Sequence, residues 1–284
     1  MGSILIGSAA FFFFFLFIMI TGMLEFYHLA GRIDVRPNVY AGIFIGVVFY
    51  IFSYLFAIQY ITLEYFLIFL PLIILVFIIQ IFLRFKRPFT NIAYTLLGLV
   101  YIALPFALLH YLVFNAFEID ISNPDAADLP EYYEPNNSMD YFYLFSPAGG
   151  IKYHPHILLG FFILVWIFDT MSYIFGSLLG QQRLSRKISP KKTWEGLIGG
   201  IIITMVAGFI LSKYFIVLTT MSWLVIAVII IVMGTMGDLL ESVYKRSVNV
   251  KDSGKILPGH GGMLDRFDGV LLSAPVVFTY LQLV

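Results

Sequence analysis

Long apolar runs separated by short polar connections dominate the chain. Runs of about 20 apolar residues, the length of a helix that crosses a bilayer, occupy residues 3–24, 40–61, 63–83, 91–114, 156–180, 196–212, 215–235 and 267–284. The pattern predicts an all-α polytopic integral membrane protein with about eight transmembrane helices.

Lys and Arg are distributed unevenly among the connections between these runs. Counted from the amino terminus and with both terminal segments included, the numbers of Lys and Arg are none, two, none, three, one, five, one, five and none. Cytoplasmic connections carry an excess of Lys and Arg. The alternation therefore predicts cytoplasmic basic loops and both termini outside, an N-out/C-out topology.

Composition supports this class. Hydrophobic residues make up 60% and aromatic residues 18% of the chain, and the mean hydropathy is +0.92, which excludes an ordinary soluble domain. The net charge is zero and there is no cysteine. Disulfides, thiolate metal sites and cysteine nucleophiles are thereby excluded. We find no nucleic-acid motif and expect no nucleic-acid partner.

The spans and connections suggest three parts. Residues 1–114 form N-terminal transmembrane helices, 115–155 an acidic extracytoplasmic loop, and 156–284 a catalytic transmembrane domain with cytoplasmic loops 181–195 and 236–266. The acidic loop carries seven Asp or Glu and one Lys. Such loops are usually solvated, so we assign it no chemistry.

The segment from Asp238 to Asp268 concentrates charge in an otherwise apolar chain. If the segment is helical from Gly237 onward, the side chains of Asp238, Glu241, Ser242 and Lys245 share one face. After Pro258 and two glycines break that helix, Asp265 and Asp268, three residues apart, share a face of the next helix.

Oxygen ligands beside cations favour metal-assisted phosphoryl or nucleotidyl transfer. Carboxylates without cysteine suit a hard cation such as Mg²⁺, which is commonly bound together with substrate phosphates. The cations available to phosphate are Lys245, Arg246, Lys251, Lys255 and Arg266. The alternative is a set of solvated loop charges, but Asp265 and Asp268 begin a hydrophobic span, where carboxylates are costly.

Asp169 is the one acid placed deep inside an apolar run. It lies 13 residues after His156, about 20 Å along a helix, so its carboxylate needs a cation, a metal or a water-filled cavity. A structural hydrogen bond to a neighbouring helix is the alternative. We expect Asp169 to join the other carboxylates around a metal.

The basic segment 185–196 precedes another span. Ser189 can cap a helix that has Pro190 at its first position, which would leave free N–H groups beside Lys191 and Lys192 for a phosphate. A juxtamembrane anchor for anionic lipid headgroups is the other interpretation.

These residues form ordered blocks. They are Asp169-Thr170-x-Ser172-Tyr173-x-x-Gly176, Ser189-Pro190-Lys191-Lys192-Thr193-x-Glu195-Gly196, Ser242-x-x-Lys245-Arg246, Lys251-Asp252-x-Gly254 and Pro258-x-His260-Gly261-Gly262-x-x-Asp265-Arg266-x-Asp268. The blocks resemble those of the bacterial-type phosphatidate cytidylyltransferases, also called CDP-diacylglycerol synthases. Alanine is more usual in that family at Ser172. The Gly-Lys common after the first block is Gly180-Gln181 here, so that basic contact is either missing or supplied by Arg183. Residues 1–155 are similar in hydropathy only.

The resemblance implies that CTP and phosphatidic acid give CDP-diacylglycerol and pyrophosphate, with Mg²⁺, at the cytoplasmic face of the bacterial inner membrane. The expected catalytic residues are Asp238, Lys245, Arg246, His260, Asp265 and Arg266. The expected substrate-binding residues are Ser189, Lys191, Lys192, Thr193, Ser242, Lys251, Gly261 and Gly262. The expected metal ligands or their supporting shell are Asp169, Asp238, Glu241, Asp265 and Asp268, and not all five can bind one ion. A second cation and a homodimer are left open.

Two other functions fit a similar site. A CTP-dependent kinase of a polyprenol or another lipid would need a base to activate a hydroxyl and would release CDP. A transporter would use Asp169 as a coupling-ion site, although we see no internal repeat.

Glu25-Phe26-Tyr27 follows the first span here and the second in family members, so we expect one N-terminal helix fewer, through a natural short form or truncation.

Overall fold

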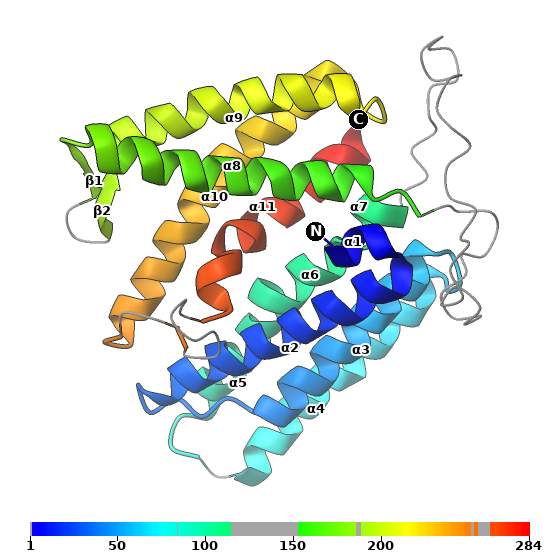
Figure 1. Ribbon diagram of the computed structural model, residues 1–284. Coiled ribbons are helices and arrows are strands. Elements are labelled where there is room, and N and C mark those ends of the chain that lie inside the picture. The colour runs from blue at the N-terminus through cyan, green and yellow to red at the C-terminus, as the bar shows by residue number, and fades with distance from the viewer. Residues whose placement is uncertain (1, 84, 115–152, 186–188, 251–252, 255–261) are drawn as a thin grey trace.

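The computed structural model describes residues 2–83, 85–114, 153–185, 189–250, 253–254 and 262–284, with only the backbone of 185, 190 and 191 (Figure 1). Its elements are α1 (Gly2–Ile6), α2 (Ser8–Gly31), α3 (Val39–Ala57), η1 (Leu63–Ile68), α4 (Phe69–Leu83), α5 (Pro88–Gly98), η2 (Leu99–Ala103), α6 (Leu104–Leu108), α7 (Tyr111–Phe114), α8 (His156–Leu179), β1 (Arg183–Ser185), β2 (Ser189–Thr193), α9 (Trp194–Tyr214), α10 (Thr220–Ser247) and α11 (Leu264–Leu283).

The predicted all-α membrane fold is confirmed. Seven helical segments of the described chain are long and apolar enough to cross a membrane. The eighth predicted span is present as α11, a helix of 20 residues that begins with acidic residues. The main difference is α10, which continues to Ser247. Half of the segment expected as loop 236–266 is therefore helical, as the spacing of its charged residues requires.

Successive long helices run in opposite directions (Figure 1). The connection 32–38, the β1–β2 hairpin and the end of α10 lie at one end of the bundle, on the left, whereas the connections 58–62 and 215–219 lie at the other. The connections rich in Lys and Arg are thus separated in space from those that lack them. This separation agrees with the alternation expected from the sequence.

The fourth span, Pro88–Phe114, is interrupted by the π-helical turn η2. Pro105 follows two residues later in α6. Proline has no N–H, and its ring clashes with the carbonyl of the residue four positions earlier. A widened turn just before it accommodates that ring within a continuous helical segment.

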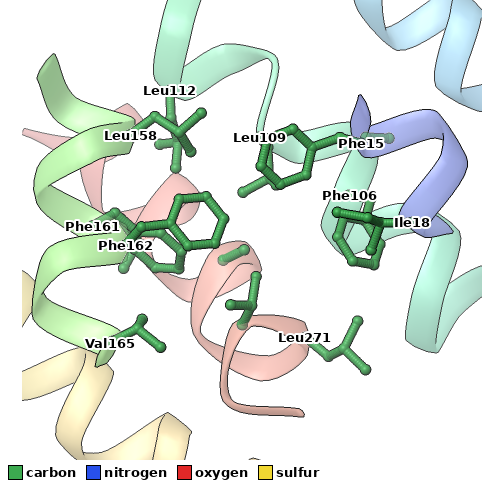
Figure 2. Packing of buried hydrophobic residues seen from close by; sticks show 14 of the residues in the cluster. Phe15, Ile18, Phe106, Leu109, Leu112, Leu158, Phe161, Phe162, Val165 and Leu271 are labelled. Atoms are coloured by element: carbon green, nitrogen blue, oxygen red, sulfur yellow. The ribbon is translucent and has the colours of Figure 1, made fainter. Parts of the chain in front are cut away.

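Aromatic and aliphatic side chains pack between α2, α6, α8 and α11 (Figure 2). Phe15 and Phe162 stack with ring centroids 5.5 Å apart, and Phe162 lies near Phe267 at the start of α11. Lipid is as apolar as these side chains, so close packing and internal hydrogen bonds hold such helices together. The core fixes α11 centrally, against α10, α6 and α2.

The expected helix cap at Ser189 is wrong. Residues Ser189–Thr193 form strand β2, which pairs antiparallel with β1 in the register Arg183↔Thr193 and Ser185↔Ser189. Helix α9 begins at Trp194, and its N-cap is Thr193, whose hydroxyl accepts from the N–H of Gly196 at 3.2 Å. Pairing with β1 satisfies backbone groups that the cap interpretation left free.

Candidate functional site

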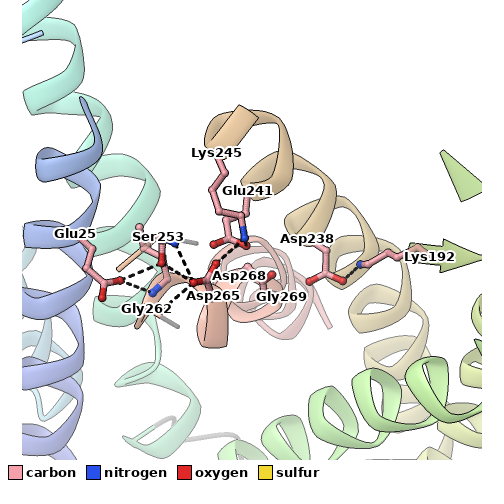
Figure 3. Close-up of polar contacts among 11 residues, drawn as sticks. Glu25, Lys192, Asp238, Glu241, Lys245, Ser253, Gly262, Asp265, Asp268 and Gly269 are labelled. Carbon is pink, nitrogen blue, oxygen red and sulfur yellow. Dashed lines mark hydrogen bonds and ion pairs between the residues drawn. The ribbon is translucent and has the colours of Figure 1, made fainter. Parts of the chain in front are cut away.

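Helices α10 and α11 approach closely where their acidic residues lie. A Cβ atom on Gly237 would be 2.3 Å from the carbonyl oxygen of Asp268, so only glycine permits this backbone separation. The contact brings Asp238 and Glu241 of α10 to the start of α11, where Asp265 and Asp268 lie (Figure 3). Two acidic pairs that are distant in sequence thus lie together.

Lys245 joins the two helices through their carboxylates. Its Nζ lies 3.0 Å from Oε2 of Glu241 and 2.6 Å from Oδ1 of Asp265. Glu241 and Lys245 are four residues apart on α10, one helical turn, so their pairing follows from helix geometry. Glu241 is also close enough to Asp265 and Asp268 to interact with both. Lys245 is thus the central cation of this cluster.

Backbone groups hold the other oxygen of Asp265. Its Oδ2 accepts from the N–H of Ser253 at 3.0 Å, the hydroxyl of Ser253 at 2.9 Å and the N–H of Gly262 at 2.9 Å (Figure 3). Together with Lys245, these contacts fix the orientation of the carboxylate. Asp268 is held differently, because its Oδ1 accepts from the N–H of Gly269 at 2.7 Å.

A second lysine reaches the cluster from the hairpin. Lys192 of β2 forms an ion pair with Asp238 of α10 (Figure 3). Partial burial lowers the pKa of Lys192 below its ordinary value, while the charges of Asp268 and Asp169 act in the opposite direction. The hairpin therefore places a cation beside acids from three helices.

Asp169 of α8 belongs to the same electrostatic neighbourhood. Its carboxylate interacts with the charges of Asp268 and Lys192. Acids of α8, α10 and α11 therefore each lie close enough to Lys192 to interact with it.

Within the described part of the chain, no three Asp, Glu or His side chains are arranged to hold a metal ion. Lysines neutralise several of the acids instead. The donor chemistry nevertheless fits a hard divalent cation, since the acids offer only oxygen ligands. In addition, Oε1 of Glu241 is buried without a hydrogen-bond partner among the described residues, and a cation would satisfy it.

The remaining predicted residues are less central or lie outside the described part. Arg246 and Arg266 are exposed and Ser242 is half-buried on α10. Gly262 contributes a backbone N–H to Asp265. The described part of the chain does not include Lys251, His260, Gly261, the side chain of Lys191 or residues 115–152 of the acidic loop.

Sequence reasoning missed two residues of the site, Glu25 and Ser253. Glu25 is buried in α2, and its Oε2 accepts from the N–H of Leu264 at 3.0 Å and lies 3.3 Å from the hydroxyl of Ser253. The signal was the same as for Asp169, an acid in an apolar helix. It was overlooked because the first apolar run ends at residue 24, while α2 continues to Gly31.

Comparisons with known proteins identify the family of this chain. A family model described as the cytidylyltransferase family matches residues 1–284. A protein named phosphatidate cytidylyltransferase from Staphylococcus haemolyticus is 46% identical over 124 residues, 43% of this chain and 47% of that protein. The protein of that name from Staphylococcus epidermidis is 43% identical over 139 residues, 48% and 51% of the two chains. The chain thus spans about half the length of the curated relatives it matches.

Proposed function

This chain belongs to the cytidylyltransferase family, and we propose that it transfers the cytidylyl group of CTP to phosphatidic acid, forming CDP-diacylglycerol and pyrophosphate. The observation that carries this proposal is the family match over residues 1–284. The charged cluster at one end of an apolar bundle supports it, because the two substrates combine a water-soluble polyanion with a lipid.

The reaction joins two anions. A phosphate oxygen of phosphatidic acid forms a bond to the α-phosphorus of CTP, and the bond from that phosphorus to the oxygen bridging to the β-phosphate breaks. Pyrophosphate leaves with the electron pair. The lipid phosphate is already ionised at neutral pH and needs no strong base. Catalysis therefore depends mainly on positioning and charge neutralisation.

Lys192 and Lys245 are the described cations that we assign to substrate phosphates. Each is held by carboxylates, so it is oriented before a phosphate oxygen takes the place of a carboxylate oxygen. Arg246 and Arg266, both exposed on the helices that carry the acids, are further candidates for phosphate contacts.

We assign a Mg²⁺ site to the carboxylates of Asp238, Glu241, Asp268 and Asp169, with Asp265 as a further candidate. When bound, the ion would neutralise charge on the triphosphate and the departing pyrophosphate. Asp265 has both oxygens engaged by Lys245, Ser253 and Gly262. Its main task is therefore to hold Lys245 and the preceding segment in place.

We place the site at the cytoplasmic face of the bacterial inner membrane. The Lys- and Arg-rich connections support this orientation, and phosphatidic acid would then enter from the inner leaflet while CTP arrives from the cytoplasm. A homodimer is compatible with this arrangement, and light scattering in detergent measures it.

Product analysis tests the proposal. Purified protein is incubated with Mg²⁺, phosphatidic acid and CTP labelled in the cytosine ring, and we expect label in a lipid product with release of pyrophosphate. Labelled CDP with a newly phosphorylated lipid would instead identify a CTP-dependent lipid kinase. No turnover, together with movement of an ion or solute into proteoliposomes, would identify a transporter.

A further inference from the structure

Glu25 connects the first long helix to the segment that precedes α11. Its side chain is only 5% exposed, although it lies in α2 among apolar residues. Oε2 accepts from the N–H of Leu264 at 3.0 Å and lies 3.3 Å from the hydroxyl of Ser253 (Figure 3). Oε1 is buried without a hydrogen-bond partner among the described residues. Because burying a carboxylate is costly, the contacts of Oε2 must stabilise Glu25 at this position in α2.

Ser253 lies between Glu25 and Asp265. Its hydroxyl is 2.9 Å from Oδ2 of Asp265 and 3.3 Å from Oε2 of Glu25. One hydroxyl donates one proton, so it serves one carboxylate at a time, while the N–H of Ser253 stays on Asp265 at 3.0 Å. The two acids therefore hold Ser253 from two sides.

The close approach of this segment to Glu25 depends on two glycines. A Cβ atom on Gly254 would lie 2.4 Å from Oε1 of Glu25, and one on Gly262 would lie 2.6 Å from Oε2 and 2.0 Å from Oγ of Ser253. Real Cβ atoms do not approach so closely. The backbone is thus fitted around the Glu25 carboxylate on two sides.

We infer that Glu25 is a positioning residue for the reaction: through Ser253 and the N–H of Leu264 it fixes residues 253–254 and 262–264, of which Ser253 and Gly262 donate their N–H groups to Asp265. Asp265 in turn orients Lys245. The inference rests on the proposed function. Glu25 itself contacts no substrate. It gives the N-terminal helices a part in the site that hydropathy alone does not reveal.

The competing explanation is that Glu25 only anchors α2 to the bundle. Tyr244 provides a matched control for that role, because its hydroxyl donates to the carbonyl of Phe26 at 3.0 Å and so joins α10 to α2 one residue further along. Tyr244→Phe removes this bond and keeps the ring that stacks on Phe26 at 5.0 Å. The bond that is removed involves neither Ser253 nor Leu264.

Two Glu25 variants separate the effect of side-chain length from the effect of charge. Glu25→Asp keeps the charge but withdraws it from Ser253 and Leu264, and we expect kcat for CDP-lipid formation to fall about tenfold, with KM for CTP nearly unchanged. Glu25→Gln keeps an acceptor oxygen at the same reach and should lose less than Glu25→Asp. Adding Ser253→Ala to Glu25→Asp should cost less than the product of the two single effects, because both act on Asp265 by one route.

Hydrogen–deuterium exchange gives a readout that does not depend on activity. Glu25→Asp should increase exchange at the N–H groups of Ser253 and Leu264, whereas Tyr244→Phe should not. The positioning role would be overturned if Glu25→Asp left exchange at these two N–H groups unchanged. It would also be overturned if Glu25→Asp lowered thermal stability but left kcat unchanged, as we expect for Tyr244→Phe. If the parent protein formed no CDP-lipid, the proposed function would fail on its own, and exchange would still decide whether Glu25 holds the segment.

Discussion

At the scale of single residues, Asp265 has the most completely specified environment in the cluster. It accepts from three groups through Oδ2 and pairs with Lys245 through Oδ1. Asp265→Asn keeps the shape and removes the charge. We expect kcat to fall about 100-fold, close to 2.7 kcal/mol, while the protein elutes normally from size exclusion in detergent.

The control for this variant is Asp34→Asn. Asp34 is exposed after α2 and has a positive φ of 58°, a conformation that asparagine also adopts readily. The same chemical change there should leave kcat unaltered. Near-normal turnover by Asp265→Asn would contradict the role assigned to Asp265.

Lys192 provides a prediction about binding. Lys192→Ala removes the cation paired with Asp238, so we expect KM for CTP to rise about tenfold. Added salt should weaken CTP binding less in the variant than in the parent protein, because a screened attraction has been lost. Lys213→Ala, at the other end of α9 beside the Phe209 ring, is the control. An unchanged salt profile in Lys192→Ala would assign Lys192 to lipid headgroups instead.

The helical placement of the acids of α10 and α11 could be predicted from the sequence, because helical spacing determines which side chains share a face. It did not predict Glu25 or Ser253. Their contact spans 228 positions and depends on how α2 lies against the segment before α11. Residue spacing also does not predict the ion pair between Lys192 and Asp238. That pair depends on the pairing of β1 with β2, which the sequence analysis did not predict.

At the scale of elements, the contact between α10 and α11 sets the site. Gly237→Ala would place a Cβ atom 2.3 Å from the carbonyl oxygen of Asp268, and backbone cannot yield as a flexible side chain does. We expect the helices to separate, with a loss of about 1–3 kcal/mol in stability and a parallel loss of activity. Thermal inactivation in detergent measures the first effect and CDP-lipid formation the second.

Gly31→Ala is the matched control for Gly237→Ala. Gly31 is also helical, at the end of α2, and no atom lies within 4 Å of its added Cβ. Alanine is the better helix former, so stability should stay the same or rise slightly. If Gly237→Ala behaved like Gly31→Ala, the close approach of α10 and α11 would not be what assembles the acids.

Helix existence was predictable from apolar runs, but helix ends were not. The continuation of α10 to Ser247 is supported by packing and by the pairing of Glu241 with Lys245, neither of which hydropathy records. The segment Ser189–Thr193 contains a favourable cap residue and a proline, yet it pairs with Arg183–Ser185 as a strand. Local capping preference was outweighed by backbone pairing between two segments.

At the scale of the whole molecule, the separation of basic and non-basic connections predicts orientation. The chain has no cysteine, so single cysteines can be labelled without background. We expect a membrane-impermeant maleimide added to intact cells to label Tyr60→Cys, at an exposed turn after α3, and not Arg87→Cys, before α5. The reverse pattern would place the charged cluster outside the cell.

The third long span, Leu63–Leu83, which contains α4, shares little of its surface with the rest of the protein. Only 11% of the span Leu63–Leu83 is buried, so its position depends more on the thickness of the surrounding hydrocarbon than on its neighbours. In a thinner bilayer this segment would tilt first to relieve hydrophobic mismatch. Membrane thickness would then shift Lys86 and Arg87 relative to the headgroups, while α10 and α11, which pack against each other, keep their arrangement.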